Sequence, residues 1–99
     1  MEKIKTQGFT AKDEFNSAVS ESLADAKNSI IHVVDVMVKE DKEGKVAAFF
    51  KDGEGKIYAT ISDTVIEQSL ALMDLVPADI LVSPRKSKNN REYLVLELQ

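Results

Sequence analysis

Apolar and polar residues alternate along the middle of the chain, in the pattern typical of half-buried β-strands. Residues 30–39 are mostly Ile, Val and Met and form one long apolar segment. In 45–51 and again in 56–61, an apolar set alternates with a set that carries the lysines. Asp52-Gly53-Glu54-Gly55, between these two segments, is a tight hairpin signal. The pattern predicts three strands, of which the second and third form a hairpin.

Two other segments have the spacing of amphipathic helices, in which apolar residues recur every three or four positions. The first covers 10–28, begins with a capping signal from Thr10 and Asp13, and has a face built largely from alanine. Such a weakly apolar face is expected to lie on a body formed by other elements. The second covers 62–76, and Pro77 ends its apolar stripe. The sequence therefore predicts an N-terminal helix and a short helix later in the chain.

Two further strands are predicted near the end of the chain, over 79–85 and 91–98, joined by a polar and basic turn at 86–90. After residue 29 the order of elements is therefore three strands, a helix and two strands. A five-stranded Greek-key barrel of the oligonucleotide/oligosaccharide-binding (OB) type has this succession, with a long first strand and a helix that closes one end. We expect one mainly β domain over 1–99, with a tail and helix in 1–29 and an OB-like barrel in 30–99.

Two segments of the chain are similar to a known family. AAFFKDGEGKIYATIS and SPRKSKNNREYLVLEL resemble the hairpins of small single-stranded DNA-binding proteins of phages and mobile elements. Together with the order of elements, the resemblance covers 30–99. It implies non-enzymatic binding of single-stranded DNA, with little sequence preference, in replication or recombination. The implied partners are single-stranded DNA and proteins of replication or recombination. From the composition we expect a folded monomer or a small homo-oligomer, without cofactors.

The side chains expected on the ligand surface follow from the period of two. If the apolar sets fill the barrel, the other residues of the first hairpin point outward, and two aromatic rings share a face with lysines. Bases of single strands stack on such rings while cations follow the phosphates, and each stacked base contributes roughly 1 to 3 kcal/mol. The residues expected to bind nucleic acid are Lys45, Phe49, Lys51, Lys56, Tyr58, Arg85, Lys86, Lys88, Arg91 and Tyr93.

Structural roles can explain the same residues without a ligand. Phe49 and Tyr58 can form a cross-strand aromatic pair beneath the N-terminal helix, which contributes about 0.2 to 1 kcal/mol. Phe49 and Phe50 are adjacent, so a register slip of one residue would exchange their faces and make Phe50 the stacking residue. The basic turn can be an ordinary solvated loop. His32 is expected to be a packed or rim histidine rather than a catalytic base, since no nucleophile or second histidine accompanies it. Asp35 is expected either to point outward between strands or to accept a hydrogen bond from a buried donor, rather than to act in catalysis.

Charge is unevenly distributed along the chain. The formal net charge is −4, which disfavours non-specific binding of double-stranded DNA. Residues 85–91 nevertheless hold four basic residues and no acid, whereas 62–79 hold four acids and no base. A local basic surface can attract a polyanion although the whole molecule is acidic.

The composition excludes several classes of site. The sequence has no cysteine and one histidine, which excludes disulfides, thiolate zinc sites, cysteine nucleophiles and sites with two histidines. We expect no metal site and no enzyme. No apolar run is long enough to cross a membrane, and the first residues are too polar for a signal peptide, so we expect a cytoplasmic protein. The alternative function is a protein-interaction or assembly module that uses the same barrel without nucleic acid.

Overall fold

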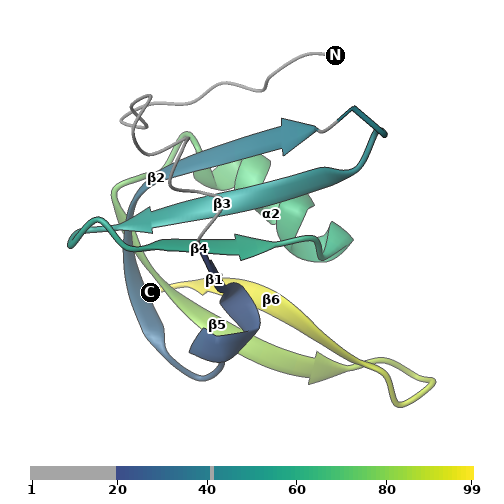
Figure 1. Cartoon of the computed structure of the whole chain (residues 1–99). Helices are drawn as coiled ribbons and strands as arrows, with labels where there is room; N and C mark the ends of the chain where they lie inside the picture. Colours follow the sequence, from purple (N-terminus) through teal and green to yellow (C-terminus); the bar gives the residue numbers. More distant parts are fainter. Residues whose placement is uncertain (1–19, 41) are drawn as a thin grey trace.

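A computed structural model describes residues 20–40 and 42–99 of the chain. These residues form a curled sheet with α2 packed against it (Figure 1). The strands are β1 (Glu21–Ser22), β2 (Ile30–Glu40), β3 (Val46–Asp52), β4 (Ile57–Thr60), β5 (Ala78–Lys86) and β6 (Glu92–Leu98). A short 3₁₀ helix, η2 (Leu23–Ala26), follows β1, and α2 (Asp63–Leu72) lies between β4 and β5 in the chain. The order across the sheet is β1-β4-β3-β2-β5-β6.

The long strand β2 makes the sheet curl, because its two ends pair with different neighbours. Residues 30–33 pair antiparallel with β5, and Val33 and residues 35–40 pair antiparallel with β3. The register shifts between Val33 and Asp35, and such an irregularity bends a strand and increases its twist. The predicted long first strand is confirmed, and the structure shows that it is shared by both halves of the sheet, which folds into a half-barrel.

The core lies on the concave side of the half-barrel. Val36 and Val38 of β2 are opposite Phe50 and Ala48 of β3, and all four are 0% exposed. Strands β5 and β6 and the two helices complete the core. They contribute Ile80 and Val82 from β5, Leu96 from β6, Leu23 and Ala26 from η2, Val65 and Leu72 from α2, and Met73, which follows α2. Burial of a large aliphatic or aromatic side chain contributes about 1.5 to 3 kcal/mol. This alternation therefore decides which face of each strand points outward.

The predicted strands and the second helix are present. Strands β2 to β6 match the predicted ranges, with ends shifted by at most one residue. The helix α2 is shorter than the predicted 62–76, because the chain after Leu72 continues in tighter turns. Asp74 N donates to Ala71 O at 3.2 Å, and Leu75 N donates to Leu72 O at 2.8 Å. The apolar spacing continues through these turns, so the pattern alone does not mark the end of the helix.

The predicted N-terminal helix is wrong over 20–28, and its part over 10–19 lies outside the described residues. The chain forms β1, then η2, and then a turn in which Asn28 has a φ of 66°. The Ser22 hydroxyl accepts a hydrogen bond from Ala24 N at 3.3 Å, which starts η2 as a separate short helix. Leu23 and Ala26 are three residues apart, a spacing that a 3₁₀ turn satisfies as well as an α-helix. Because Leu23 enters the main core, this segment packs as one unit with the strands.

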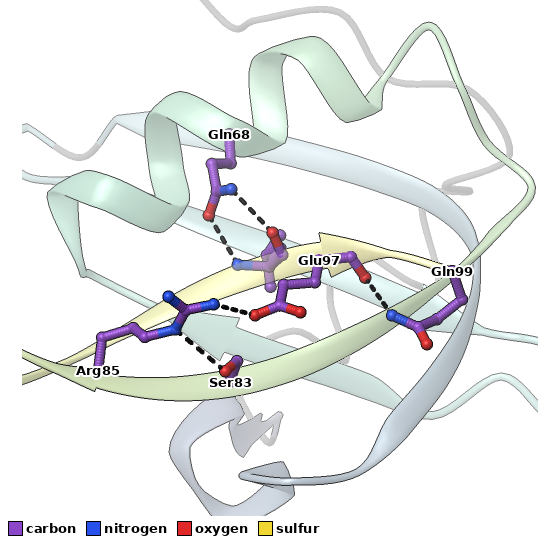
Figure 2. A network of polar contacts seen from close by, with 6 residues as sticks. Gln68, Ser83, Arg85, Glu97 and Gln99 are labelled. Atoms are coloured by element: carbon purple, nitrogen blue, oxygen red, sulfur yellow. Dashed lines mark hydrogen bonds and ion pairs between the residues drawn. The ribbon is translucent and has the colours of Figure 1, made fainter.

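The described sheet has six strands instead of the five expected, and its two edges are β1 and β6. The additional strand, β1, pairs in parallel with β4. The edge of β6 is covered in part by a side chain of α2 (Figure 2). The Gln68 amide donates to Leu96 O at 2.9 Å and accepts a hydrogen bond from Leu96 N at 2.8 Å. Gln68 thus takes the place that the backbone of another strand would have at this edge.

Candidate nucleic-acid interface

Phe49 points to the outer side of the half-barrel. It lies opposite Met37 of β2 and Ala59 of β4, whereas its neighbour Phe50 is 0% exposed in the core. The predicted orientation of Phe49 is confirmed, and the alternative register that would bring Phe50 outside is wrong. The outer face of β3 is formed by Ala47, Phe49 and Lys51.

The predicted faces of β4 are wrong. Tyr58 lies opposite Phe50, so it is on the core side, where it packs partly buried against the core. Ile57 lies opposite Lys51 and is therefore on the other face, where it is only 6% exposed, so its predicted burial is confirmed although its predicted face is not. Phe49 and Tyr58 are thus on opposite faces of the sheet. They form neither the predicted shared stacking surface nor the alternative cross-strand pair.

The length of the β3–β4 turn explains this difference. Asp52 N donates to Lys56 O at 2.9 Å, and Gly55 N donates to Asp52 O at 3.0 Å, so the loop consists of residues 53–55. Gly55 has a φ of 88°, which is usual at the end of a hairpin loop of this length. A two-residue turn would have placed Ile57 opposite Phe50. The additional residue exchanges the faces of the residues in β4.

Lys56 and Tyr58 belong to a separate cluster beside β1. The Lys56 ammonium lies 3.2 Å from Glu21 Oε1 and 5.2 Å from the centre of the Tyr58 ring. The hydrogen bond to Glu21, followed by the influence of Tyr58, raises the pKa of Lys56 above its ordinary value. These two predicted site residues are therefore engaged with each other and with Glu21, away from the face that carries Phe49.

A hollow of about 290 Å³ lies on the outer face, at the end of β2 and the start of β3. Phe49 and Ile61 line it as large apolar side chains, and Lys39 and Lys45 line it as cations. The remaining lining residues are Glu40, Val46 and Ala47. This volume is at the lower limit of small-molecule sites, roughly 300 Å³, and suits one flat ring system. Two of the residues predicted to bind nucleic acid, Lys45 and Phe49, therefore line the same hollow.

Two residues of this hollow are absent from the predicted site. Lys39 is the last residue of the predicted first strand, and it lies on the outer face opposite Ala47. The alternation of faces along that strand would have been enough to predict that Lys39 lies on the outer face. Ile61 is assigned to the interior by the sequence pattern, yet it is 78% exposed. Its exposure follows from the same three-residue turn that exchanged the faces of β4.

The hairpin of β5 and β6 carries the other predicted cations. Arg85 lies opposite Tyr93 on the outer face, and Tyr93 is 39% exposed. The Arg85 guanidinium donates hydrogen bonds to Glu97 and to the Ser83 hydroxyl (Figure 2). Hydrogen bonds from Arg85 and then from Ser83 hold the pKa of the Glu97 carboxyl below its ordinary value. A polyanion would therefore compete with Glu97 for Arg85.

The tip of this hairpin is a three-residue loop, 88–90. Asn90 N donates to Ser87 O, and Ser87 N donates to Arg91 O, both at 2.9 Å. Asn90 has a φ of 65°, a conformation that asparagine tolerates better than most residues. The Ser87 hydroxyl also accepts a hydrogen bond from Arg91 N at 3.3 Å. The loop thus has a defined conformation and presents the exposed residues Lys86, Lys88 and Arg91.

Figure 1 shows where the loops and turns that carry these residues lie. The β2–β3 loop and the β5–β6 hairpin extend to the right of the view, whereas the β3–β4 turn is at the left. Lys45 and the hollow are beside the first loop, so they lie at the same end of the sheet as the basic hairpin. Lys51 and Lys56 flank the β3–β4 turn at the opposite end. The structure therefore divides the predicted site into two groups.

His32 and Asp35 take structural positions. His32 Nδ1 lies 2.6 Å from Asp79 Oδ1, and both side chains are exposed. Asp35 is 3% exposed and lies on the outer face of β2, opposite Lys51. Within 20–40 and 42–99, no cluster of three or more acidic or histidine side chains is arranged to hold a metal ion. The helices in this part of the chain lack the length and apolar character needed to cross a membrane.

Comparison with known protein families, with curated proteins and with solved structures finds no match for this chain. The resemblance to phage and mobile-element proteins therefore stays a prediction from the two hairpin segments and the order of elements. The function has to be inferred from the hollow beside Phe49 and from the basic hairpin.

Proposed function

We propose that the protein binds single-stranded DNA, without enzymatic activity, on a scaffold of the OB type. The observation that carries this proposal is the hollow beside Phe49, where an aromatic ring, an exposed isoleucine and two lysines line one open space. Stacking of a base on a ring, with ammonium groups near the phosphates, is how single strands are commonly bound. A role in replication or recombination of a phage or mobile element is the biological part of the proposal.

The order of the strands supports the OB scaffold. Without β1, the order is β4-β3-β2-β5-β6, and α2 is inserted between β4 and β5 in the chain. An OB barrel binds its ligands on the second and third strands and at the loops between strands one and two and between strands four and five. The corresponding parts of this chain are β3, β4, the β2–β3 loop and the β5–β6 hairpin. The hollow and the basic hairpin occupy these places.

The charged and aromatic residues around the interface determine the salt dependence and the sequence preference that we expect for binding. Lys39 and Lys45 line the hollow, and exposed cations follow on the hairpin, where Tyr93 offers a second ring. Glu40 in the hollow and Glu97 beside Arg85 reduce the positive potential. Affinity therefore depends on a small number of cations, and each one that binds a phosphate adds about 0.7 to the slope with which log K falls against log salt. Sequence preference is weak because every base has a face that can stack.

The variant Phe49→Leu tests the proposal at the ring. Leucine keeps an apolar side chain opposite Met37 and removes the aromatic surface. In a fluorescence anisotropy titration with labelled oligo-dT at low salt, the Kd should rise about 5- to 150-fold, because a stacked base contributes roughly 1 to 3 kcal/mol. Thermal unfolding followed by circular dichroism verifies that the fold is retained.

The variant Tyr58→Leu is the matched control. Its ring is on the core side near Lys56, so its loss should lower the melting temperature and leave the affinity for oligo-dT unchanged. Equal losses of affinity in the two variants would contradict a stacking site at Phe49. A wild-type protein that gives no anisotropy change at micromolar concentration and low salt would end the proposal.

A protein-interaction module is the second candidate function. It is favoured by a hollow of about 180 Å³ between α2 and β6, beside which Leu75 and Leu98 are 53% and 58% exposed. A shift in size-exclusion chromatography with a replication or recombination protein, without retention on a single-stranded DNA column, would favour this function over the first.

A further inference from the structure

Ile61, which directly follows β4, is shared by two hollows on this side of the molecule. It is 78% exposed, more than any other large apolar side chain in the described part of the chain. It lines the hollow beside Phe49 and also a second hollow of about 360 Å³. Single exposed isoleucines are common on protein surfaces. This one, together with Ala47, lines both hollows.

The second hollow lies between β1 and the end of β4. Ala47 and Ala59 contribute small side chains to it, and Ala47 also lines the first hollow. Hydroxyl groups come from Ser20, Ser22 and Thr60, and Glu21 adds a carboxylate. That carboxylate is paired with Lys56 Nζ at 3.2 Å, which reduces its repulsion of an anion. The second hollow is therefore suited to an apolar ring that has polar groups at its edge.

We infer that Ile61 is a wedge between two consecutive bases of a bound single strand. One base stacks on Phe49 in the first hollow, and the next lies against Ala47 and Ala59 in the second. This inference rests on the proposed function. Isoleucine suits the role because its β-branched side chain has few rotamers and keeps its direction. Apolar side chains inserted between bases are a known means of unstacking nucleic acids.

The test uses a single-stranded oligonucleotide made of a fluorescent adenine analogue that is quenched when it stacks on its neighbours. The anisotropy of an end label reports binding, and the emission of the analogue reports unstacking. With the wild-type protein, emission should rise on binding. Ile61→Ala should remove most of this rise and increase the Kd about fivefold, the scale of one lost apolar contact. Because Ile61 is exposed, the variant should fold normally.

The matched control is Ile30→Ala. Ile30 is 60% exposed, lines neither hollow, and pairs with Leu81 in the other half of the sheet. Its replacement should change neither signal. Binding by the wild type without a rise in emission overturns the wedge and leaves DNA binding intact, and so does an undiminished rise with Ile61→Ala. Complete absence of binding overturns the proposed function, and the wedge with it.

Discussion

Among single residues, Arg85 and Glu97 show how a local contact changes the charge available to a ligand. Both lie on the outer face of the β5–β6 hairpin, where the predicted cations are. The guanidinium donates to an internal carboxylate, so Arg85 is expected to contribute less to the proposed phosphate binding than the exposed Lys86 and Lys88. The sequence pattern does not reveal this pairing, because Arg85 and Glu97 come together only through the register of the hairpin.

The Arg85–Glu97 contact should persist at a pH at which an isolated glutamate is already protonated. Because the folded state lowers the pKa of Glu97, the stabilisation by this contact is present above the ordinary glutamate pKa, near 4.3. It is lost as the pH falls through the lower pKa of the folded protein. In an NMR titration of the side-chain carboxyl groups, Arg85→Met should raise the pKa of Glu97 toward its ordinary value.

The variant Lys86→Met is the control for this titration, since it removes a neighbouring positive charge without removing the hydrogen bond. It should leave the pKa of Glu97 nearly unchanged. The same Glu97 pKa in the wild type and in Arg85→Met would show that the contact does not form in solution.

Among the elements, the strands were predicted well because their apolar sets alternate clearly. The face of β3 followed directly from the contrast between Val46, Ala48 and Phe50 and their neighbours. The face of β4 did not, because it depends on whether the turn after Asp52 has two or three residues. The two glycines of Asp52-Gly53-Glu54-Gly55 allow either length. The prediction of a helix over 20–28 is wrong because one pattern again fits two structures: the apolar spacing of this segment suits a 3₁₀ turn as well as an α-helix.

The contact between α2 and the edge of β6 gives a prediction for Gln68. Gln68→Met keeps the length of the side chain but leaves Leu96 N and O without these hydrogen bonds. The free energy of unfolding in urea should fall by about 1 to 3 kcal/mol, the cost of buried backbone groups without partners. The edge also becomes available to another strand, so sedimentation should show self-association that rises with concentration.

The variant Glu67→Met is the control, because Glu67 is an exposed neighbour on the same helix. It should change the free energy of unfolding by less than about 0.5 kcal/mol. Equal effects of the two substitutions would mean that the methionine itself, and not the loss of the edge contact, causes the change.

For the whole molecule, the attraction of a polyanion depends more on where the charged residues lie than on the net charge. The net charge is −4, yet Lys39, Lys45 and the exposed Lys86, Lys88 and Arg91 lie at the end of the sheet that carries the hollow and the hairpin, where Glu40 and Glu92 also lie. The order of elements predicted which loops could meet at this end. It did not separate Lys45, beside the hollow, from Lys51 and Lys56 near the opposite turn. That separation depends on where each residue lies along its strand in the folded sheet.

The exposed tip of the hairpin gives a prediction for salt dependence. If Lys88 binds a phosphate, Lys88→Ala should reduce the slope of log K against log salt by about 0.7 to 1. Oligonucleotides of different sequence should lose affinity equally, since a phosphate contact carries no base information. Lys88→Arg keeps the charge and should keep the slope. A slope that is unchanged in Lys88→Ala would remove this residue from the interface.

The bent strand β2 also limits how this protein can be rearranged. Because one strand hydrogen-bonds to both halves of the sheet, a cut near Val34 would leave two incomplete pieces. Neither half can be exchanged as an independent module during recombination or protein engineering. Insertions are better tolerated at the exposed loop tips, 53–55 and 88–90, where no strand is interrupted.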